Sequence, residues 1–294
     1  MNSSYLDAES DLKGKRNRSS MQGLKRLLRK TCAEYQNLPF SVYSSLTEQH
    51  ILNVPIVKPL FIYVLDGKKE LGDGKEAVCH KGEFIFLANT PQVDMRNISQ
   101  GSEYFALIIE FDYQDFNLFT QVPKESRKYF KGQVNQVLAQ TLTQFVEWAP
   151  EVPQSMWSLR RQELLQLLYH QGFEQICSIA AAPSITHKVE QIINANIQSD
   201  IGVEFVAERL AMSGSTLRRK LSLENTSFQS IKDRIKLGYG LHLLQCSSTA
   251  IGLIAAQCGY QSQSRFTDKF KALFGLTPSE LRKTRSGNLS DMGE

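Results

Sequence analysis

The stretch "CGYQSQSRFTDKFKALFGLTPSELRK", residues 258–283, contains the signals that define two consecutive helices. Phe266 and Phe270 are four residues apart and therefore lie on one face of a helix. Ser262 precedes them as a suitable N-cap. Gly275 can take the left-handed conformation that ends a helix. Thr277-Pro278-Ser279-Glu280 then forms a capping box with proline at the first helical position, which predicts a second helix.

The same pattern occurs once more upstream, in "FVAERLAMSGSTLRRKL", residues 205–221. Its capping serine is Ser213, and its apolar pair is Leu217 and Leu221. An apolar-Ala pair, a tight turn, a serine and two apolar residues four apart outline a helix-turn-helix unit in both copies. We therefore predict two such units, with capping serines at Ser213 and Ser262.

Residues 228–245, "FQSIKDRIKLGYGLHLLQ", lie between the two units and predict a connecting helix. A helix of 17 or 18 residues spans about 25 Å. That length would place two recognition helices about one DNA turn apart on one face of a duplex.

In each unit, the side of the second helix that faces away from the apolar pair is predicted to contact DNA. Arg binds guanine bidentately, Gln reads adenine, and Asp accepts from cytosine N4, whereas Lys suits backbone phosphates. Arg218 and Arg219 could instead form a solvated helix face, and Asp268 could pair with Arg265 three residues earlier. The predicted DNA-binding residues are Ser215, Thr216, Arg218, Arg219, Gln263, Ser264, Arg265, Thr267 and Asp268, and the predicted phosphate contacts are Lys220, Lys269 and Lys271.

The positive charge of the chain is concentrated in its last third. The formal net charge is +4. Residues 185–285 contain 14 Lys and Arg against 8 Asp and Glu, a balance of +6, which leaves −2 for the remainder. This distribution favours a polyanionic partner for the C-terminal part.

Over about residues 186–283 the sequence resembles the DNA-binding domain of AraC/XylS-type bacterial transcriptional regulators. The pattern that carries the resemblance is G-Y/F-x-x-x-S-x-F-x-x-x-F-K-x-x-F-G-x-T-P. It implies a cytoplasmic regulator of transcription, expected to be an activator, with promoter DNA and RNA polymerase as partners. The family's base contacts carry over to Ser215, Arg218, Arg219, Gln263, Ser264, Thr267 and Asp268. Asp268 stands where relatives often have a basic residue, Gly240 where Ala is usual, and Lys236 where Arg is common.

The part before residue 120 predicts short strands separated by turns. "FIYVL", "KKEL", "EAVCH", "FIFLA" and "EYFALIIEF" alternate with turn signals such as Asp66-Gly67. They predict a small antiparallel barrel or sandwich of five or six strands, similar to the cupin-type domain of the same regulators. The whole chain is thus predicted to be an α+β protein.

We divide the chain into five parts from these signals. The expected parts are a disordered basic tail (1–35), a cupin-like sensor or regulatory domain (36–120), a helical interdomain or dimerisation region (121–181), a double helix-turn-helix domain (182–286) and a second tail (287–294). The leucines of residues 159–168 could form a core or a homodimer seam. Met21 could be the native start in place of Met1.

Several other classes of function are disfavoured by what the sequence contains. The histidines are His50, His80, His170, His187 and His242, without an H-x-H in the strand region, so neither a metal nor another cofactor is expected. No phosphate-binding glycine loop or nucleophile-elbow motif occurs. Five scattered cysteines without a C-x-x-C pair are typical of a reducing cytoplasm, and no apolar run is long enough for a membrane helix.

The N-terminal domain leaves two alternatives open and a third remote. It could sense a small-molecule effector, or it could dock a regulatory protein, because an apolar interior and an apolar docking face look alike in one sequence. The remote alternative is a cupin-type metalloenzyme. Within the DNA-binding part, Arg218 and Arg219 lead us to expect that the first unit contributes more to affinity than the second.

Overall fold

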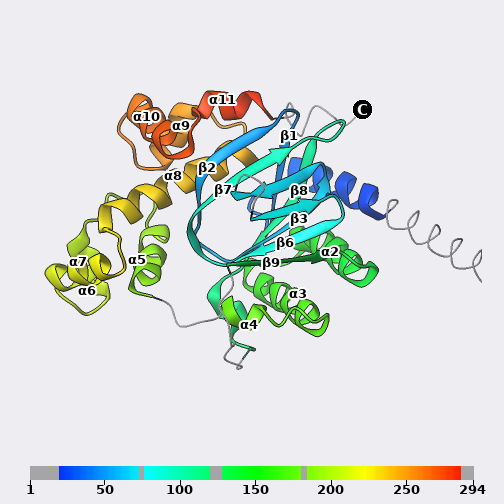
Figure 1. Ribbon diagram of the computed structural model, residues 1–294, viewed down its shortest axis with the longest axis horizontal. Coiled ribbons are helices and arrows are strands. Elements are labelled where there is room, and N and C mark those ends of the chain that lie inside the picture. The colour runs from blue at the N-terminus through cyan, green and yellow to red at the C-terminus, as the bar shows by residue number, and fades with distance from the viewer. Residues whose placement is uncertain (1–19, 73–75, 120–127, 180–183, 286–294) are drawn as a thin grey trace, which may run out of the picture.

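The computed structural model describes residues 20–72, 76–119, 128–179 and 184–285, and its centre is formed by two antiparallel sheets. Figure 1 shows the sheets between helices of the N-terminal half on one side and the C-terminal helices on the other. The first sheet has the strand order β1 (Ser41–Ser45), β8 (Tyr104–Glu110), β3 (Leu60–Asp66), β6 (Glu83–Leu87) and β9 (Tyr129–Gln133). The second has the order β2 (Gln49–Ile56), β7 (Thr90–Ile98), β4 (Lys68–Leu71) and β5 (Ala77–His80).

The first sheet is buried on both faces. Phe61, Phe84 and Phe105 point into a core formed with the helices of the N-terminal half. Their neighbours Ile62 and Ile85 point to the opposite side, into a core shared with the second sheet. Strands buried on both faces read as continuous apolar runs, which explains why "FIYVL" and "FIFLA" were recognisable as strands.

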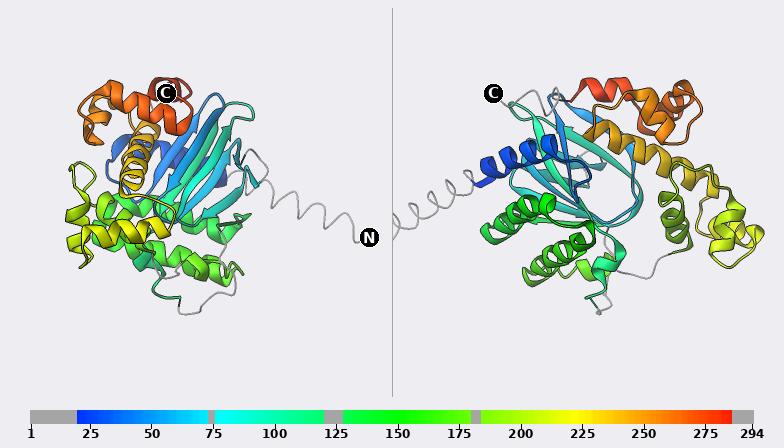
Figure 2. Two further views of the ribbon diagram at one scale, coloured as in Figure 1. Left: turned by 60° about the vertical axis from the view of Figure 1, so that its left-hand side comes forward. Right: turned by 180° about the vertical axis from the view of Figure 1, so that it is seen from behind.

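Apart from the N-terminal helix at residues 20–34, the α-helices follow the sheets along the chain and form two groups. Figure 2 shows that α5 to α11 lie apart from α2, α3 and α4. The first group contains α2 (Gln136–Trp148), α3 (Trp157–His170) and α4 (Ile176–Ile179), preceded by the short η2 (Tyr113–Phe116). The second contains α5 (Ile185–Asn194), α6 (Val203–Arg209), α7 (Gly214–Leu223), α8 (Phe228–Cys246), α9 (Ile251–Gln257), α10 (Gln263–Phe274) and α11 (Pro278–Lys283).

The prediction of a barrel of five or six strands is not confirmed, because the strands form two separate sheets. The turn at Asp66-Gly67 is present, but β3 and β4 on either side of it belong to different sheets. Gly67 has φ +72°, and a Cβ there would lie 2.4 Å from the Ile98 carbonyl oxygen. The turn at Asp66-Gly67 was therefore predicted correctly, because a tight turn depends on local residues. The strands on either side of it do not pair with each other, because strand pairing is not a local property.

The boundary at residue 120 is also wrong, because β9 lies in the range expected to be helical and pairs with β6. Three further strands were missed. They are β1, β2 and β7, and the first two lie before residue 61, where the first predicted strand begins.

The expected N-terminal tail is contradicted for residues 20–34, which form a helix. Leu24 and Leu28 of this helix are buried in the same core as the first sheet. On the polar side, the Lys25 ammonium lies 2.6 Å from Asp66 and 2.8 Å from Glu103. The spacing of Leu24 and Leu28 is a helical signal that the basic composition of this segment obscured. The rest of the expected N-terminal tail (1–19), residues 180–183 and the expected second tail (287–294) lie outside the described residues.

The C-terminal helices belong to two different hydrophobic cores. Leu217 and Leu221 of α7 pack with Ile231 and Ile235 of α8 in a small core of their own. In contrast, the phenylalanines of α10 are in one core with both sheets. The second helix-turn-helix unit is therefore joined to the β-domain, whereas the first is a separately packed body.

Candidate nucleic-acid interface

The first unit has the geometry that its sequence predicts. The Ser213 side chain accepts a hydrogen bond from the Thr216 amide and so caps α7. Leu217 and Leu221 are buried. The exposed residues on α7 include Ser215, Arg218, Arg219 and Lys220, and Thr216 is half-buried. Asn225 follows the helix with φ 55°, the left-handed conformation typical of a helix end.

The second unit repeats this geometry with larger buried side chains. Ser262 caps α10 through the Arg265 amide, and Phe266 and Phe270 are fully buried. Gly275 ends the helix with φ +81°, and Thr277 forms the predicted capping box with Glu280. The predicted contact residues Gln263, Ser264, Arg265, Asp268 and Lys271 are exposed, and Thr267 and Lys269 are half-buried.

The connecting helix α8 separates the two candidate recognition helices. It has 19 residues, which corresponds to about 28 Å. Figure 1 shows the first unit near one end of α8 and the second unit above its other end. Ile231, Ile235 and Leu244 are buried as expected, and Leu243 is partly buried. This separation suits successive contacts along one duplex.

Several cations in this part of the molecule are paired with carboxylates, and three of them lie on α7, α8 and α10. Arg218 Nη2 lies 3.1 Å from Glu204 Oε1, and Lys232 Nζ lies 2.6 Å from Asp200 Oδ1. Lys269 also forms an ion pair, with Asp233 of α8. Two of the predicted DNA contacts, Arg218 and Lys269, are thus held by acidic neighbours that the sequence analysis did not consider.

The second unit is attached to the β-domain by a chain of buried polar groups. Lys69 of β4 donates to Asn97 Oδ1 (2.7 Å), and Asn97 donates to Gln49 Oε1 (2.8 Å). Gln49 then donates to Thr284 Oγ1 (2.7 Å), just after α11, and accepts from Gln245 of α8 (3.1 Å). Because every member except Thr284 is buried, these bonds are difficult for water to replace.

Helix α5, which packs against the first unit, contacts the β-domain through a smaller polar group. The Asn89 amide donates to the Val57 carbonyl (2.8 Å) and to Glu190 Oε2 (3.0 Å) of α5. The ring of His187, also on α5, lies 4.0 Å from that of Tyr113.

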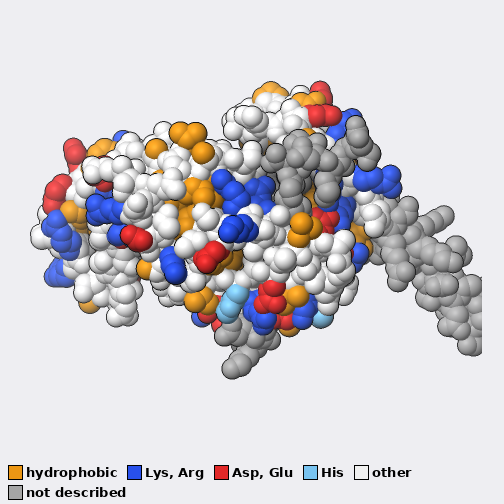
Figure 3. Space-filling model, turned by 90° about the horizontal axis from the view of Figure 1, so that it is seen from above, with side chains coloured by type: hydrophobic (Ala, Val, Ile, Leu, Met, Phe, Trp, Pro, Cys, Tyr) orange, Lys and Arg blue, Asp and Glu red, His pale blue; other side chains and the backbone are white. Residues whose placement is uncertain are grey.

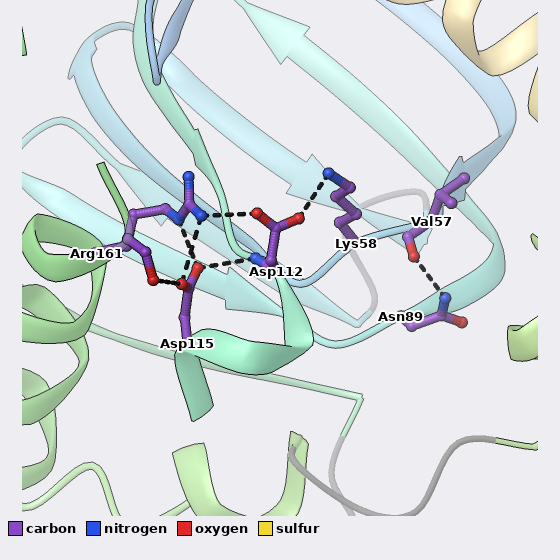
Figure 4. Close-up of polar contacts among 7 residues, drawn as sticks. Val57, Lys58, Asn89, Asp112, Asp115 and Arg161 are labelled. Atoms are coloured by element: carbon purple, nitrogen blue, oxygen red, sulfur yellow. Dashed lines mark hydrogen bonds and ion pairs between the residues drawn. The ribbon is translucent and has the colours of Figure 1, made fainter. Parts of the chain in front are cut away.

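A cavity of about 350 Å³ lies where the β-domain meets α5 and α8. Apolar side chains such as Ile62, Met95 and Leu241 line most of it, and the charged lining residues are Lys58, Lys69 and Glu110. Lys58 is engaged by Asp112 (2.8 Å), which also pairs with Arg161 (2.7 Å), as Figure 4 shows. Lys69 is 3% exposed, and its burial lowers its pKa from 10.5 to about 8.

Neither the cavity nor the role of Lys69 in it was predicted from the sequence. In the strand "KKEL" one of the two adjacent lysines must face inward, because side chains alternate along a strand. The pattern could therefore have identified one buried lysine, but not the helices that close the cavity.

Neither a membrane-spanning helix nor a metal-binding cluster was found in the described part of the chain. No described helix is long and apolar enough to cross a membrane. Among the same residues, no three His, Cys, Asp or Glu side chains are grouped so that they could hold a metal ion.

Comparison with known proteins identifies the C-terminal part. A family model described as a helix-turn-helix domain matches residues 206–284. The porin thermoregulatory protein EnvY of Escherichia coli K12 is 38% identical over 95 residues, which is 32% of this chain and 38% of EnvY. The transcriptional regulator AdiY of the same strain is 35% identical over 94 residues, 32% of this chain and 37% of AdiY. The chain thus matches less than half the length of these relatives.

The whole described fold is similar to that of ToxT from Vibrio cholerae. A 1.65 Å structure of ToxT aligns with a TM-score of 0.64 at 15% identity, over 86% of this chain and all of ToxT. A structure of ToxT with a bound unsaturated fatty acid aligns with a TM-score of 0.61, also at 15% identity, over 86% of this chain and 99% of ToxT. At this identity the similarity concerns the fold.

The two capped and repeated units, the connecting helix and the match at residues 206–284 agree with the resemblance seen in the sequence. The C-terminal part of this chain is a helix-turn-helix domain of the AraC/XylS family.

Proposed function

We propose that this protein is a sequence-specific DNA-binding regulator of transcription and not an enzyme. The observation that carries the proposal is the presentation of two capped helices, α7 and α10, whose outer faces expose groups that hydrogen-bond to bases and phosphates. Their apolar faces are buried, so that the polar faces are presented in fixed orientations. Activation of a promoter through RNA polymerase, homodimerisation and a cytoplasmic location belong to the same proposal, as does a cupin-like origin of the N-terminal domain.

Arg219 and Arg218 are the residues that we propose to read bases in the first unit. A bidentate contact between Arg and guanine contributes about 1–3 kcal/mol of discrimination. Arg219 is exposed, and no ion pair involves it in the described part of the chain. Arg218 must first break its ion pair with Glu204 before it can contact DNA.

The test is an electrophoretic mobility shift with the full chain, on a duplex selected from a random library by the protein itself. Arg219→Ala and Arg218→Ala should each weaken binding to the selected duplex by roughly fivefold or more. Lys30→Ala, on the N-terminal helix, serves as a control and should bind like the wild type. If no sequence is enriched from the library, the proposed function is wrong. Unchanged binding of both arginine variants would place the recognition surface elsewhere.

The N-terminal domain is proposed to sense a small molecule in the cavity between the β-domain, α5 and α8. Most of its lining is apolar, and the buried Lys69 ammonium donates a hydrogen bond to a neutral group, the Asn97 amide oxygen. A buried cation is stabilised by an anion, so the cavity suits an apolar molecule with one anionic group. The fatty acid bound to the similarly folded ToxT has this chemistry.

The effector proposal is tested with oleate and oleyl alcohol as probes, by isothermal titration below the concentration at which oleate forms micelles. Wild type should bind oleate roughly tenfold or more tightly than the alcohol, because the carboxylate pairs with Lys69. Lys69→Met should remove this difference, and the matched control Lys58→Met should retain most of it, because Lys58 is already paired with Asp112. Equal binding of the acid and the alcohol would contradict the assignment and favour a regulatory protein as the partner of this domain.

A further inference from the structure

An acidic side chain of α6 lies against the DNA-reading helix of the first unit. We propose that Glu204 lowers the affinity of the proposed DNA binding, because it takes the place of a DNA phosphate beside Arg218 and has to be displaced before Arg218 can contact DNA. This inference rests on the proposed function and concerns one residue that neither the motif nor the family resemblance identifies.

The position of Glu204 is well defined by α7. Its Oε1 atom lies 3.1 Å from Nη2 of Arg218. A Cβ added to Gly214, the first residue of α7, would lie 2.2 Å from Oε2. The carboxylate is therefore beside both the first turn of α7 and its arginine. This is where an anion is favoured, since the amide groups at a helix N-terminus carry partial positive charge.

The pair is open to solvent and can be exchanged. The side chains of Glu204 and Arg218 are 71% and 58% exposed. An exposed pair of this kind contributes little to folding stability. Its consequence therefore concerns the molecules that compete with Glu204 for Arg218, and a DNA phosphate is the nearest chemical equivalent.

The same arrangement recurs along the connecting helix. Asp200 holds Lys232, and Asp233 holds Lys269. Figure 3 shows basic side chains at the end of the molecule formed by α6 and α7, with acidic side chains next to them. Among the described residues, however, Glu204 is the carboxylate that forms an ion pair with a predicted base-reading arginine.

The effect on affinity follows from the exchange. On an unrelated sequence Arg218 would exchange the carboxylate only for a phosphate and gain little, so that it stays paired with Glu204. On the correct sequence Arg218 gains bidentate hydrogen bonds to a base, at the cost of the ion pair. Glu204 in addition repels the phosphates that approach α7. It thus lowers the affinity for both kinds of sequence.

The experiment compares Glu204→Gln with Glu208→Gln in the full chain. Both residues are exposed on α6, and both substitutions remove one negative charge and preserve size. Binding is measured by fluorescence anisotropy at several salt concentrations, on the library-selected duplex and on a scrambled duplex of equal length and composition. Glu204→Gln should bind the scrambled duplex roughly three- to tenfold more tightly, with a salt slope steeper by about 0.9 for one additional phosphate contact. The selected duplex should gain at least as much, because Arg218 no longer has to break the ion pair there, whereas Glu208→Gln, which leaves Arg218 paired with Glu204, should have a smaller effect on both duplexes.

A second comparison identifies the role of Arg218. In an Arg218→Gln background, Glu204→Gln should have little effect, because the cation that it competes for is absent. The inference is overturned if Glu204→Gln behaves like Glu208→Gln while the wild type still selects a DNA sequence, or if its effect persists without Arg218. A wild type that selects no sequence overturns the proposed function itself, and with it this inference.

Discussion

At the scale of the residue, Lys69 is the side chain with the most unusual surroundings. It is fully enclosed between the sheets and α8, hydrogen-bonded to a neutral amide, and its pKa is lowered to about 8 by burial. Burial of this charge destabilises the folded state. Lys69 thus destabilises the free protein and lines a cavity, and both properties are consistent with a role in binding a ligand.

The lowered pKa of Lys69 predicts a folding stability that depends on pH. Between about pH 8 and 10.5 the unfolded chain still binds the Lys69 proton and the folded chain has lost it, so stability should rise with pH over this range. Each pKa unit corresponds to about 1.4 kcal/mol. The measurement is urea unfolding of wild type and Lys69→Met from pH 7 to 10. The wild type should gain stability relative to the variant above about pH 8, and parallel curves would contradict the burial of the charge.

At the scale of the element, α8 has a glycine for a packing reason. Gly240 looked from the sequence like a weak point that softens the connecting helix. A Cβ there would lie 2.8 Å from the Phe266 ring and 3.2 Å from Cys258 Sγ. Gly240 therefore allows α10 to approach α8 closely.

We expect Gly240→Ala to destabilise the protein by about 1–3 kcal/mol through overpacking, even though Ala favours a helix. The matched control is Gly23→Ala in the N-terminal helix, where no atom lies within 4 Å of the added Cβ. That change should stabilise the protein by about 0.5–1 kcal/mol. Chemical denaturation measures both, and stabilisation by Gly240→Ala would show that the helices are less closely packed.

The two recognition helices are also expected to differ in their contribution to affinity. The outer face of α7 carries Arg218, Arg219 and Lys220 and no acidic residue, whereas α10 combines Arg265, Lys269 and Lys271 with Asp268. Anionic DNA favours the first set. The double variant Arg218→Ala/Arg219→Ala should lose more affinity for the selected duplex than Gln263→Ala/Arg265→Ala, and equal losses in a titration would contradict this ranking.

At the scale of the whole molecule, the two helix-turn-helix units differ in what stabilises them. The second unit is in one hydrophobic core with the sheets and is joined to them by Gln49, which bonds to Asn97, Gln245 and Thr284. The first has a core of its own, completed by α5 and the first half of α8. Motion of one unit relative to the other would therefore occur along α8.

Hydrogen exchange followed by mass spectrometry should detect this difference. Peptides from α6 and α7 should exchange at a lower free energy of opening than peptides from α9 and α10, which should open only with the β-domain. Gln49→Leu should lower protection in α9 to α11 and leave α6 and α7 unchanged, because it removes buried hydrogen bonds to the second unit only. Uniform protection of both units would show that they unfold together.

The sequence by itself determined the local features of this protein. The capping serines, Gly275, the capping box at Thr277 and the apolar faces of α7 and α10 depend on residues within one or two helical turns, and the structure confirms each. Only the tertiary structure decided which strands pair, that residues 20–34 pack as a helix, and that Glu204 contacts Arg218. It also brought Lys69 into a cavity closed by a helix more than 150 residues later in the chain. These contacts join segments far apart in sequence, and their free energy depends on packing that local patterns do not encode.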